Sequence, residues 1–357
     1  MKNITIIVGA RPNFMKVAPL LRLIDKEKDF DTTLIHTGQH YDKKMSDVFF
    51  QDLEIRKPDY NLNVGSASHS IQTARIMEEF EKVCEKIMPD LLIVVGDINS
   101  TMACSLVAKK LHIKVAHIEA GLRSYDRDMP EEINRLVTDA ISDYFFVTEK
   151  SGEENLIQEG HDKSNIFFVG NLMIDSLHYG LNKIKSKESS PDPDGDYGLI
   201  TLHRPSNVDN IDNLKSILDG LSEISNNIKL FFSIHPRTKQ KIQENKIIIN
   251  ENITILDALA YLDFLSIMKN AKVIFTDSGG IQEESTALKI PCYTLRNNTE
   301  RPITLTQGSN RLVKPNKQGI IKSFKKFRYD INLDYKLPDG WDGHTSKRII
   351  DIIKKLK

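Results

Sequence analysis

Long hydrophobic runs are missing from this sequence of 357 residues. No stretch approaches the ~20 apolar residues that a membrane-spanning helix needs, and the first apolar segment is short and ends at Gly9. We therefore expect neither a membrane protein nor a signal peptide. Cysteines are also few, and Cys84, Cys104 and Cys292 have no C-x-x-C spacing. They predict neither a disulfide framework nor a metal site, and they suit a reducing, cytoplasmic location.

A net charge is absent as well, because 49 Lys and Arg residues balance 49 Asp and Glu residues. A neutral chain gives no reason to expect nucleic acid or an anionic membrane surface as a partner. Any anionic ligand must then be bound by local positive groups. The sequence also lacks a G-x-G-x-x-G or Walker loop, so nothing predicts nicotinamide or ATP, and we expect no cofactor.

Two domains are the expectation for a chain of this length. Buried β-branched segments alternate with amphipathic helical segments, which is the pattern of an α/β fold with parallel sheets. The patch richest in Ser, Pro, Asp and Gly is Ser186–Gly198. We therefore place the domain boundary near Gly170–Gly198.

Carboxylates follow expected strands in the first half. Glu119 comes directly after the strand Lys114–Ile118, where open α/β sheets bind ligands. Glu131 and Glu132 lie in the first turn of the next expected helix. Acids at a helix start are also favoured by the helix dipole alone. On local grounds Glu119 is thus the stronger acid/base candidate, and Glu132 suits a structural role.

Cations and a further acid follow two other expected strands. Arg11 and Lys16 come after the strand Ile4–Val8, near a helix start whose N–H groups favour phosphate. Lys16 equally suits a solvated helix face. Asp97 follows the strand Asp90–Val95, and either substrate chemistry or helix capping explains an acid there.

Imidazoles end two expected strands in the second half. His203 and His235 each have an arginine close by in the sequence, a combination that suits phosphate binding. After the strand Val273–Thr276, the consecutive Gly279 and Gly280 let the backbone approach a pyrophosphate at a helix start.

Further charged residues in the second half also suit the binding of a nucleotide. Of Glu283 and Glu284, one suits a hydrogen bond to ribose hydroxyls, because an acid beside phosphate would otherwise repel it. Arg301, directly before a proline, has the character of another phosphate clamp.

Taken together, seven motifs resemble the non-hydrolysing UDP-N-acetylglucosamine 2-epimerases in order and spacing. The motifs, between about Ile4 and Arg311, are GARPNFMK, VVGDINST, HIEAGLRS, MPEEINR, TLHRPSNVD, TDSGGIQEES and TERP. The resemblance implies a GT-B-like architecture with two Rossmann-like domains whose parallel sheets face a central cleft. It places an N-terminal domain at residues 1–175, a C-terminal UDP-binding domain at 176–342, and a helix at 343–357 that crosses back to the first domain.

The resemblance also implies roles for particular residues. The acid/base candidates are Asp97, Glu119 and Glu131, and His203 lies near the diphosphate in the same catalytic set. The nucleotide-binding positions are Arg11, Lys16, Ser278, Gly279, Gly280, Glu284 at the ribose, and Arg301, with Phe264 near the uracil.

The implied reaction is reversible inversion at C2 of UDP-N-acetylglucosamine, giving UDP-N-acetylmannosamine for surface polysaccharide synthesis. UDP leaves first, a carboxylate removes the C2 proton to give a 2-acetamidoglucal, and UDP adds back. The expected partner is a UDP-sugar, and the expected assembly is a homodimer. Four alternatives stay open: a hydrolysing epimerase, an epimerase of a modified UDP-sugar, a GT-B glycosyltransferase, which the acid trio disfavours, and a non-catalytic nucleotide-sugar sensor, which requires those acids to do nothing.

The sequence departs from this family at several positions. Asn13 and Ser206 stand where many relatives have Glu, which bears on substrate preference. Many bacterial members are activated by substrate at a second site, for which this chain keeps Gln39, His40 and His235. It has Tyr41-Asp42 where an Arg is usual. Losing a guanidinium there predicts weak or absent activation.

Overall fold

The computed structural model describes residues 1–38, 53–185, 195–257, 259–327 and 335–356. These form two compact units, which we treat separately. The N-terminal unit comprises Met1–Tyr179 and Asp339–Lys357, and the C-terminal unit comprises Gly180–Pro338. Among the described helices, none is both long and apolar enough to cross a bilayer.

The N-terminal unit is built on a parallel sheet of seven strands in the order β3-β2-β1-β4-β5-β6-β7. Its central strands are continuous apolar runs that are buried on both faces, as parallel sheets require. The strands are β1 (Lys2–Val8), β2 (Phe30–His36), β3 (Tyr60–Asn61), β4 (Leu91–Val95), β5 (Lys114–Ile118), β6 (Tyr144–Val147) and β7 (Ile166–Phe168).

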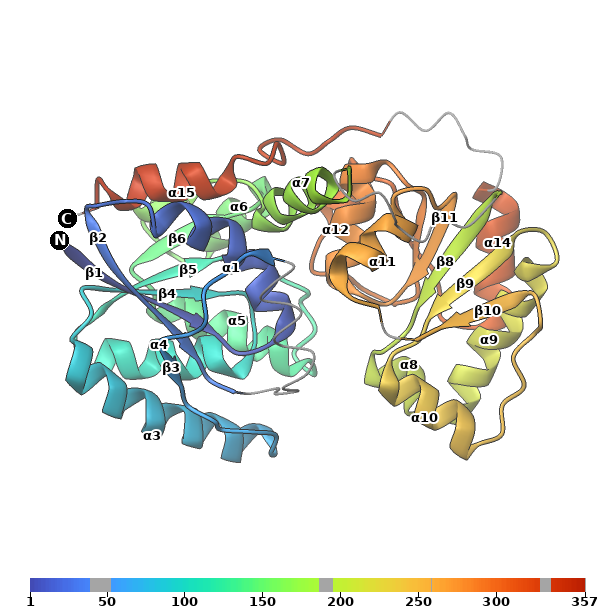
Figure 1. Ribbon diagram of the computed structural model, residues 1–357, viewed down its shortest axis with the longest axis horizontal. Coiled ribbons are helices and arrows are strands. Elements are labelled where there is room, and N and C mark those ends of the chain that lie inside the picture. The colour runs from blue at the N-terminus through green and yellow to red at the C-terminus, as the bar shows by residue number, and fades with distance from the viewer. Residues whose placement is uncertain (39–52, 186–194, 258, 328–334, 357) are drawn as a thin grey trace. The chain divides into compact units, whose positions relative to one another are not determined.

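Helices cover both faces of this sheet (Figure 1). The helices α3 and α4 pack together on one face, and α1 packs with α15 on the other. The helices are α1 (Arg11–Ile24), α3 (His69–Ile87), α4 (Asn99–Lys110), α5 (Pro130–Ile141), α6 (Lys150–Gln158), a 3-10 turn at Lys163–Asn165, α15 (Thr345–Ile353) and α7 (Leu172–Lys185), whose residues from Gly180 on belong to the C-terminal unit.

The C-terminal segment belongs to the N-terminal unit because buried polar contacts hold it there. The carboxylate of Asp175 accepts hydrogen bonds from the backbone N–H groups of Thr345 (3.1 Å) and Ser346 (2.8 Å) at the start of α15. The indole of Trp341 is buried and donates to the carbonyl of Thr148 at 3.2 Å. In Figure 1 this last helix (red) runs alongside α1 (blue).

The C-terminal unit repeats the design with a parallel sheet of six strands in the order β10-β9-β8-β11-β12-β13. The strands are β8 (Tyr197–Thr201), β9 (Lys229–Ser233), β10 (Ile253–Leu256), β11 (Val273–Thr276), β12 (Cys292–Thr294) and β13 (Asn310–Leu312). The helices are α8 (Pro205–Val208), α9 (Ile211–Ser225), α10 (Pro236–Glu244), α11 (Tyr261–Met268), α12 (Gly279–Leu288), α13 (Ile303–Thr306) and α14 (Lys317–Phe327).

Both sheets reverse their strand order once, and that is where an open α/β sheet binds ligands, beyond the carboxyl ends of the strands. In the N-terminal unit the reversal lies between β1 and β4, and in the C-terminal unit between β8 and β11. The predicted fold class of two Rossmann-like parallel sheets is confirmed.

Candidate functional site

The carboxyl edge of the N-terminal sheet holds a buried ion pair between two of the predicted residues. The Nζ of Lys16, in α1, lies 2.6 Å from Oε2 of Glu119, which follows β5. The side chains are only 9% and 3% exposed. The sequence left Lys16 equally suited to a solvated helix face, and the structure contradicts that alternative because α1 turns this side chain toward the strand ends.

The backbone of Gly96, after β4, fits closely against this pair. Gly96 has a left-handed φ of 69°, and a Cβ at this position would lie 3.3 Å from Nζ of Lys16 and 3.6 Å from Oε2 of Glu119. Glu119 itself has a φ of 70°. That conformation costs a non-glycine residue about 1–3 kcal/mol, and residues that adopt it cluster at functional sites.

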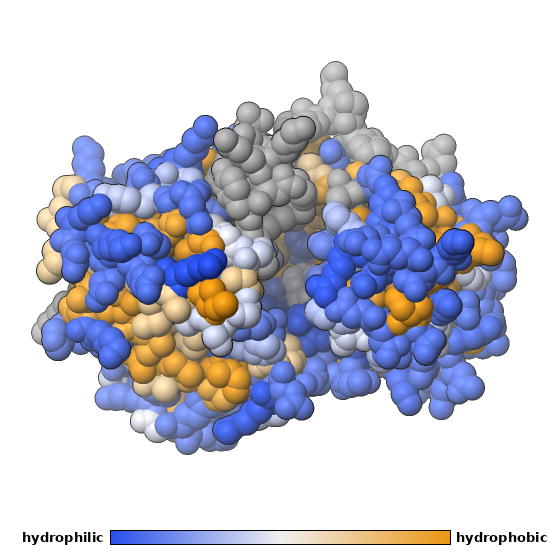
Figure 2. All heavy atoms as spheres, turned by 90° about the horizontal axis from the view of Figure 1, so that it is seen from below, coloured by the Kyte–Doolittle hydropathy of each residue, from blue (hydrophilic) through white to orange (hydrophobic). Residues whose placement is uncertain are grey.

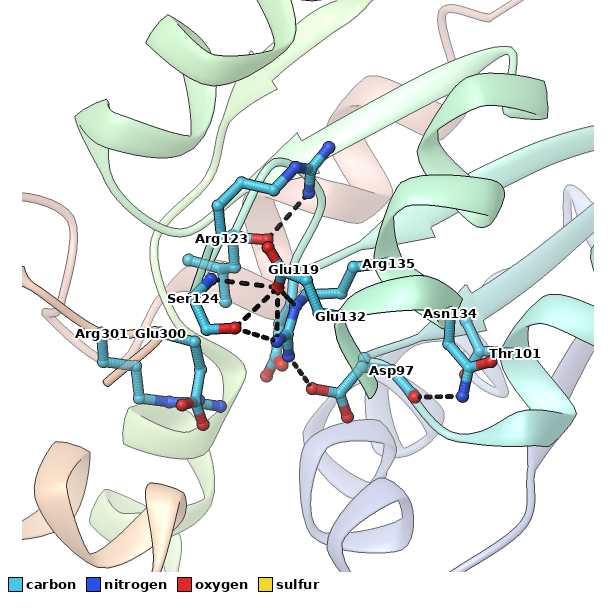
Figure 3. A network of polar contacts seen from close by, with 12 residues as sticks. Asp97, Thr101, Glu119, Arg123, Ser124, Glu132, Asn134, Arg135, Glu300 and Arg301 are labelled. Atoms are coloured by element: carbon cyan, nitrogen blue, oxygen red, sulfur yellow. Dashed lines mark hydrogen bonds and ion pairs between the residues drawn. The ribbon is translucent and has the colours of Figure 1, made fainter. Parts of the chain in front are cut away.

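Asp97 lies next to Gly96 and is held by a buried arginine. The carboxylate of Asp97 is 28% exposed and forms an ion pair with Nη1 of Arg135, a residue of α5. Arg135 is buried, and its Nε and Nη2 donate to Oε2 of Glu132 at 2.9 and 2.7 Å. Figure 3 shows the guanidinium between the two acids. The backbone carbonyl of Asp97 also accepts a 2.9 Å hydrogen bond from Asn134.

Glu132 has the structural role that the sequence indicated. Its carboxylate also accepts from the backbone N–H of Ser124 (3.0 Å) and of Tyr125 (2.9 Å), so it fixes the loop before α5. Burial alone raises the pKa of Glu132, but the hydrogen bonds from Ser124 and Arg135 outweigh burial and lower the pKa below its usual value.

Glu131 differs from its neighbour. It lies in the first turn of α5 and is partly exposed. No hydrogen bond or ion pair joins its side chain to the residues that the structure describes. Its carboxylate is therefore not committed to holding the fold, which leaves the predicted acid/base role open to test.

A second buried ion pair lies beneath these acids. His117, in β5, places Nδ1 2.6 Å from Oδ1 of Asp139 and Nε2 2.8 Å from the carbonyl oxygen of Gly96. Both side chains are fully buried. Asp139 also accepts from the N–H of Gly121 (3.0 Å) and from Arg123 (2.7 Å).

Two residues predicted near this edge complete the N-terminal unit. Arg11 is the first residue of α1, but its side chain is not among those described. Asn13 is buried, with its Oδ1 accepting from the N–H of Ala10 (3.2 Å) and its Nδ2 donating to the carbonyl of Val95 (2.9 Å). The amide thus ties the turn after β1 to the end of β4, and a Glu would reproduce only the acceptor.

In the C-terminal unit, His203 is oriented by a buried aspartate. The Nδ1 of His203 lies 3.1 Å from Oδ1 of Asp277, which follows β11. Asp277 also accepts from the backbone N–H of Arg204 (3.0 Å) and from Nδ2 of Asn207 (3.1 Å). Burial alone raises the pKa of Asp277, but these contacts lower it below its usual value. The imidazole of His203 remains 40% exposed.

His235 lies beside His203 at the neighbouring strand end. It is the N-cap of α10, its Nδ1 accepts from the N–H of Arg237 at 3.2 Å, and its ring centroid lies 5.9 Å from that of His203.

The start of α12 carries three of the residues predicted to bind phosphate. Ser278 is its N-cap, and Gly279 and Gly280 are its first two residues. A Cβ on Gly279 would lie 3.1 Å from Oε1 of Glu300 and 3.2 Å from Nη1 of Arg301. The absence of that Cβ lets the backbone N–H groups stand beside a guanidinium, an arrangement that suits phosphate.

Acidic residues hold the arginines around the start of α12. Glu300 is 3% exposed and contacts Arg301 (2.6 Å), Arg296 (2.8 Å) and, at 3.8 Å, Arg204. Burial alone raises the pKa of Glu300, but the three guanidiniums lower it well below its usual value. Arg301 also pairs with Glu283 at 2.6 Å, so Glu283 helps to orient the guanidinium of Arg301.

The remaining predicted contacts have simpler surroundings. Glu284 is buried in α12 and accepts from the hydroxyl of Tyr261 at 2.9 Å. Phe264, in α11, is partly buried against the hydrophobic core of this unit. Their contacts with ribose and uracil stay predictions.

Sequence reasoning missed the residues that hold the predicted ones in place. They are His117, Arg135 and Asp139 in the N-terminal unit and Asp277 and Glu300 in the C-terminal unit. Each lies in or within a few residues of a quoted motif, which was the available signal. Within the described ranges, no group of three His, Cys, Asp or Glu residues could hold a metal ion.

The chain is similar to known proteins in both sequence and structure. A family model described as UDP-N-acetylglucosamine 2-epimerase matches residues 22–354. The chain is 44% identical to the UDP-N-acetylglucosamine 2-epimerase of Methanocaldococcus jannaschii, over 98% of both chains. It is 38% identical, over the full length of both, to a UDP-2,3-diacetamido-2,3-dideoxy-D-glucuronate 2-epimerase of Pseudomonas aeruginosa. A crystal structure of the M. jannaschii enzyme with UDP-GlcNAc and UDP superposes with a TM-score of 0.91 at 42% identity, covering 99% of this chain and all of that one.

Proposed function

This chain belongs to the UDP-N-acetylglucosamine 2-epimerase family, and from that premise we propose that it interconverts UDP-N-acetylglucosamine and UDP-N-acetylmannosamine without releasing a free sugar. The observation that carries the proposal is the group of acids at one sheet edge. Glu119 is paired with Lys16 at 2.6 Å, and Asp97 is held by Arg135. Such groups suit proton transfer at a sugar carbon.

The proposed reaction has two reversible steps. The bond from C1 of the sugar to the UDP oxygen breaks, UDP leaves with the electron pair, and a carboxylate removes the proton from C2. The electrons of the C2–H bond form a C1=C2 double bond, which gives a 2-acetamidoglucal. A UDP oxygen then adds back to C1, and a proton is delivered to the opposite face of C2.

The C-terminal unit suits the leaving group. UDP leaves with increased negative charge, and donors fixed in advance stabilise such charge. The start of α12 with Ser278, Gly279 and Gly280 supplies N–H groups, and Arg301 stands 3.2 Å from the position that a Cβ on Gly279 would take. The exposed imidazole of His203 lies in the same unit and is oriented by Asp277.

The decisive test is proton NMR of UDP-N-acetylglucosamine incubated with the protein in D₂O. We expect deuterium at C2 and accumulation of UDP-N-acetylmannosamine as the minor epimer. Free N-acetylmannosamine as the only sugar product would instead indicate a hydrolysing enzyme. Absence of C2 exchange with any UDP-sugar would refute the epimerase proposal.

A modified UDP-sugar is the second candidate substrate. The relative from P. aeruginosa carries a diacetamido-glucuronate name and is 38% identical over its full length. Supplying UDP-N-acetylglucosamine and UDP-2,3-diacetamido-glucuronate in competition separates the two, because the preferred substrate exchanges its C2 proton first.

A homodimer and a role in supplying surface polysaccharide synthesis remain proposals. Hydrophobic surface on the N-terminal unit supports the dimer, since Ile71 in α3 is 50% exposed and Ile133 in α5 is 41% exposed. Figure 2 shows hydrophobic residues gathered on this unit, at the left of the view. Light scattering should give twice the mass of the 40.7 kDa chain, and a single-chain mass would contradict the dimer.

Substrate activation at a second site also remains a prediction, and residues 39–42 lie outside those described. We expect UDP-N-acetylmannosamine supplied alone to react without a lag. A lag that a trace of UDP-N-acetylglucosamine removes would show that Tyr41 and Asp42 do not disable the site.

A further inference from the structure

The pair His117–Asp139 contacts the backbone on both sides of the candidate acids. Nε2 of His117 lies 2.8 Å from the carbonyl of Gly96, the residue directly before Asp97. Asp139 accepts from the N–H of Gly121, two residues after Glu119, at 3.0 Å. One buried pair therefore joins the loop after β4 to the loop after β5.

The hydrogen bonds of His117 fix its charge. The carbonyl of Gly96 can only accept, so Nε2 must carry a proton. Oδ2 of Asp139 accepts from Gly121 at 3.0 Å and from Arg123 at 2.7 Å. Because a guanidinium stays charged, this buried ion pair holds Asp139 as a carboxylate. Nδ1 of His117 then also donates, and the ring is an imidazolium paired with that carboxylate. Both groups are completely buried, and removing one partner of such a pair is costly.

The two peptides that flank the Cα of Asp97 are consequently each held by a side chain. His117 binds the carbonyl of Gly96 at 2.8 Å, and Asn134 binds the carbonyl of Asp97 at 2.9 Å. Gly96 has a left-handed φ of 69°, so its peptide has alternatives if it is released. Rotation of this peptide would move the Asp97 carboxylate away from Arg135.

We propose that the His117–Asp139 pair is the positioning element that fixes Asp97 relative to Glu119, with Nε2–H of His117 as its point of action on Gly96. The proposal rests on the proposed epimerase function and adds residues to it. His117 touches no reacting atom in this role and acts through the backbone.

Two substitutions at one position isolate that point of action. A glutamine amide reaches about where Nε2 of histidine lies, and an asparagine amide about where Nδ1 lies. His117→Gln therefore keeps a donor for Gly96, whereas His117→Asn keeps a donor for Asp139 only. We expect His117→Asn to lose about 10²-fold in kcat, the typical cost of a misplaced group. We expect His117→Gln to stay within about tenfold of wild type, and KM to change little in either.

Asp143→Asn is the matched control for stability. Asp143 accepts from Lys109 (2.8 Å) and from the N–H of Val115 (2.8 Å) at the opposite, amino end of β5. This variant should lower Tm while leaving kcat close to wild type. All variants are assayed for C2 exchange well below the lowest Tm.

The outcomes separate this proposal from the proposed function. Equal losses in the two His117 variants, or a loss in Asp143→Asn as large as in His117→Asn, would overturn the positioning role. Wild-type protein without C2 exchange would refute the epimerase proposal itself. Histidine ring ¹⁵N shifts near neutral pH, assigned by the signal missing from His117→Gln, test the charge state directly even if His117→Asn does not fold. An imidazolium is expected, and a neutral ring would overturn the assignment.

Discussion

Glu131 and Glu132 are adjacent in the first turn of α5. Replacing Glu132 with glutamine should lower stability, whereas replacing Glu131 with glutamine should lower turnover. Glutamine keeps the size of the side chain and removes its charge. The helix dipole acts on both acids alike and contributes about 0.3–1 kcal/mol each. Any larger difference between the two variants must come from the contacts in which the acids differ.

For Glu132→Gln the structure predicts a large loss of stability. Oε2 of Glu132 accepts from Ser124 and from two nitrogens of Arg135, and Oε1 accepts from Tyr125 at 2.9 Å. An amide has one oxygen, so its NH₂ group must face at least one of these donors. Charged hydrogen bonds contribute about 1.5–3 kcal/mol each. We therefore expect a loss of about 3 kcal/mol, or roughly 6–12 °C in the Tm of the N-terminal unit.

For Glu131→Gln the prediction is the reverse. Glu131 is partly exposed and its side chain makes no hydrogen bond or ion pair with the described residues. Stability should change by no more than the dipole contribution of about 0.3–1 kcal/mol. If Glu131 transfers a proton in the reaction, turnover should fall by about 10²-fold or more.

Calorimetry and C2 exchange in D₂O measure the two quantities on the same samples. Near-normal turnover in Glu131→Gln would return Glu131 to a structural role at the helix start. An unchanged Tm in Glu132→Gln would refute the reasoning from buried hydrogen bonds.

Three further predictions follow. Lys16→Met removes the cation that lies 2.6 Å from Glu119, whose side chain is only 3% exposed. We expect stability to fall by about 3–5 kcal/mol and turnover to fall by at least about 10²-fold. Unchanged turnover would contradict a catalytic role for the pair. The pKa of Asp277 is lowered in the folded state, so its contribution to stability is present above the ordinary value of 3.8 and is lost as pH falls through the folded value. Asp277→Asn should therefore flatten the acid limb of the stability curve, and an unaltered acid limb would count against this assignment. Burial raises the pKa values of the thiols, to about 12 for Cys84 and about 11 for Cys292, so iodoacetamide should label the native protein slowly and the unfolded protein readily; rapid native labelling would show that these thiols are accessible.

The central strands could be predicted from sequence because they are buried on both faces. Lys114–Ile118 and Val273–Thr276 were placed with their observed bounds, since each segment is followed directly by an acid, Glu119 or Asp277. The strands β3, β10 and β13 were missed. All three lie at sheet edges and are short and partly exposed, so they lack the continuous apolar run that identifies a buried strand.

In the candidate site, the sequence predicted local positions but not contacts between residues far apart in the chain. The position of Glu119 at a strand end was visible in the sequence. Its pairing with Lys16 was not, because that contact joins residues 103 positions apart. The contact depends on β1, β4 and β5 lying side by side, and that strand order is a property of the whole sheet.

The charges around the proposed anion site of the C-terminal unit bear on the neutral composition of the chain. A chain with no net charge must bind an anion through local positive groups. Around the start of α12, the guanidiniums of Arg204, Arg296 and Arg301 face two carboxylates, Glu283 and Glu300. Among these five side chains, three positive and two negative charges leave a surplus of one, and the helix start adds roughly half a charge. The buried Asp277, directly before Ser278, is a third acid and lies 3.1 Å from the imidazole of His203. The acids therefore orient the arginines, and the start of α12 adds backbone N–H groups that suit the proposed diphosphate, while the chain as a whole carries no net charge.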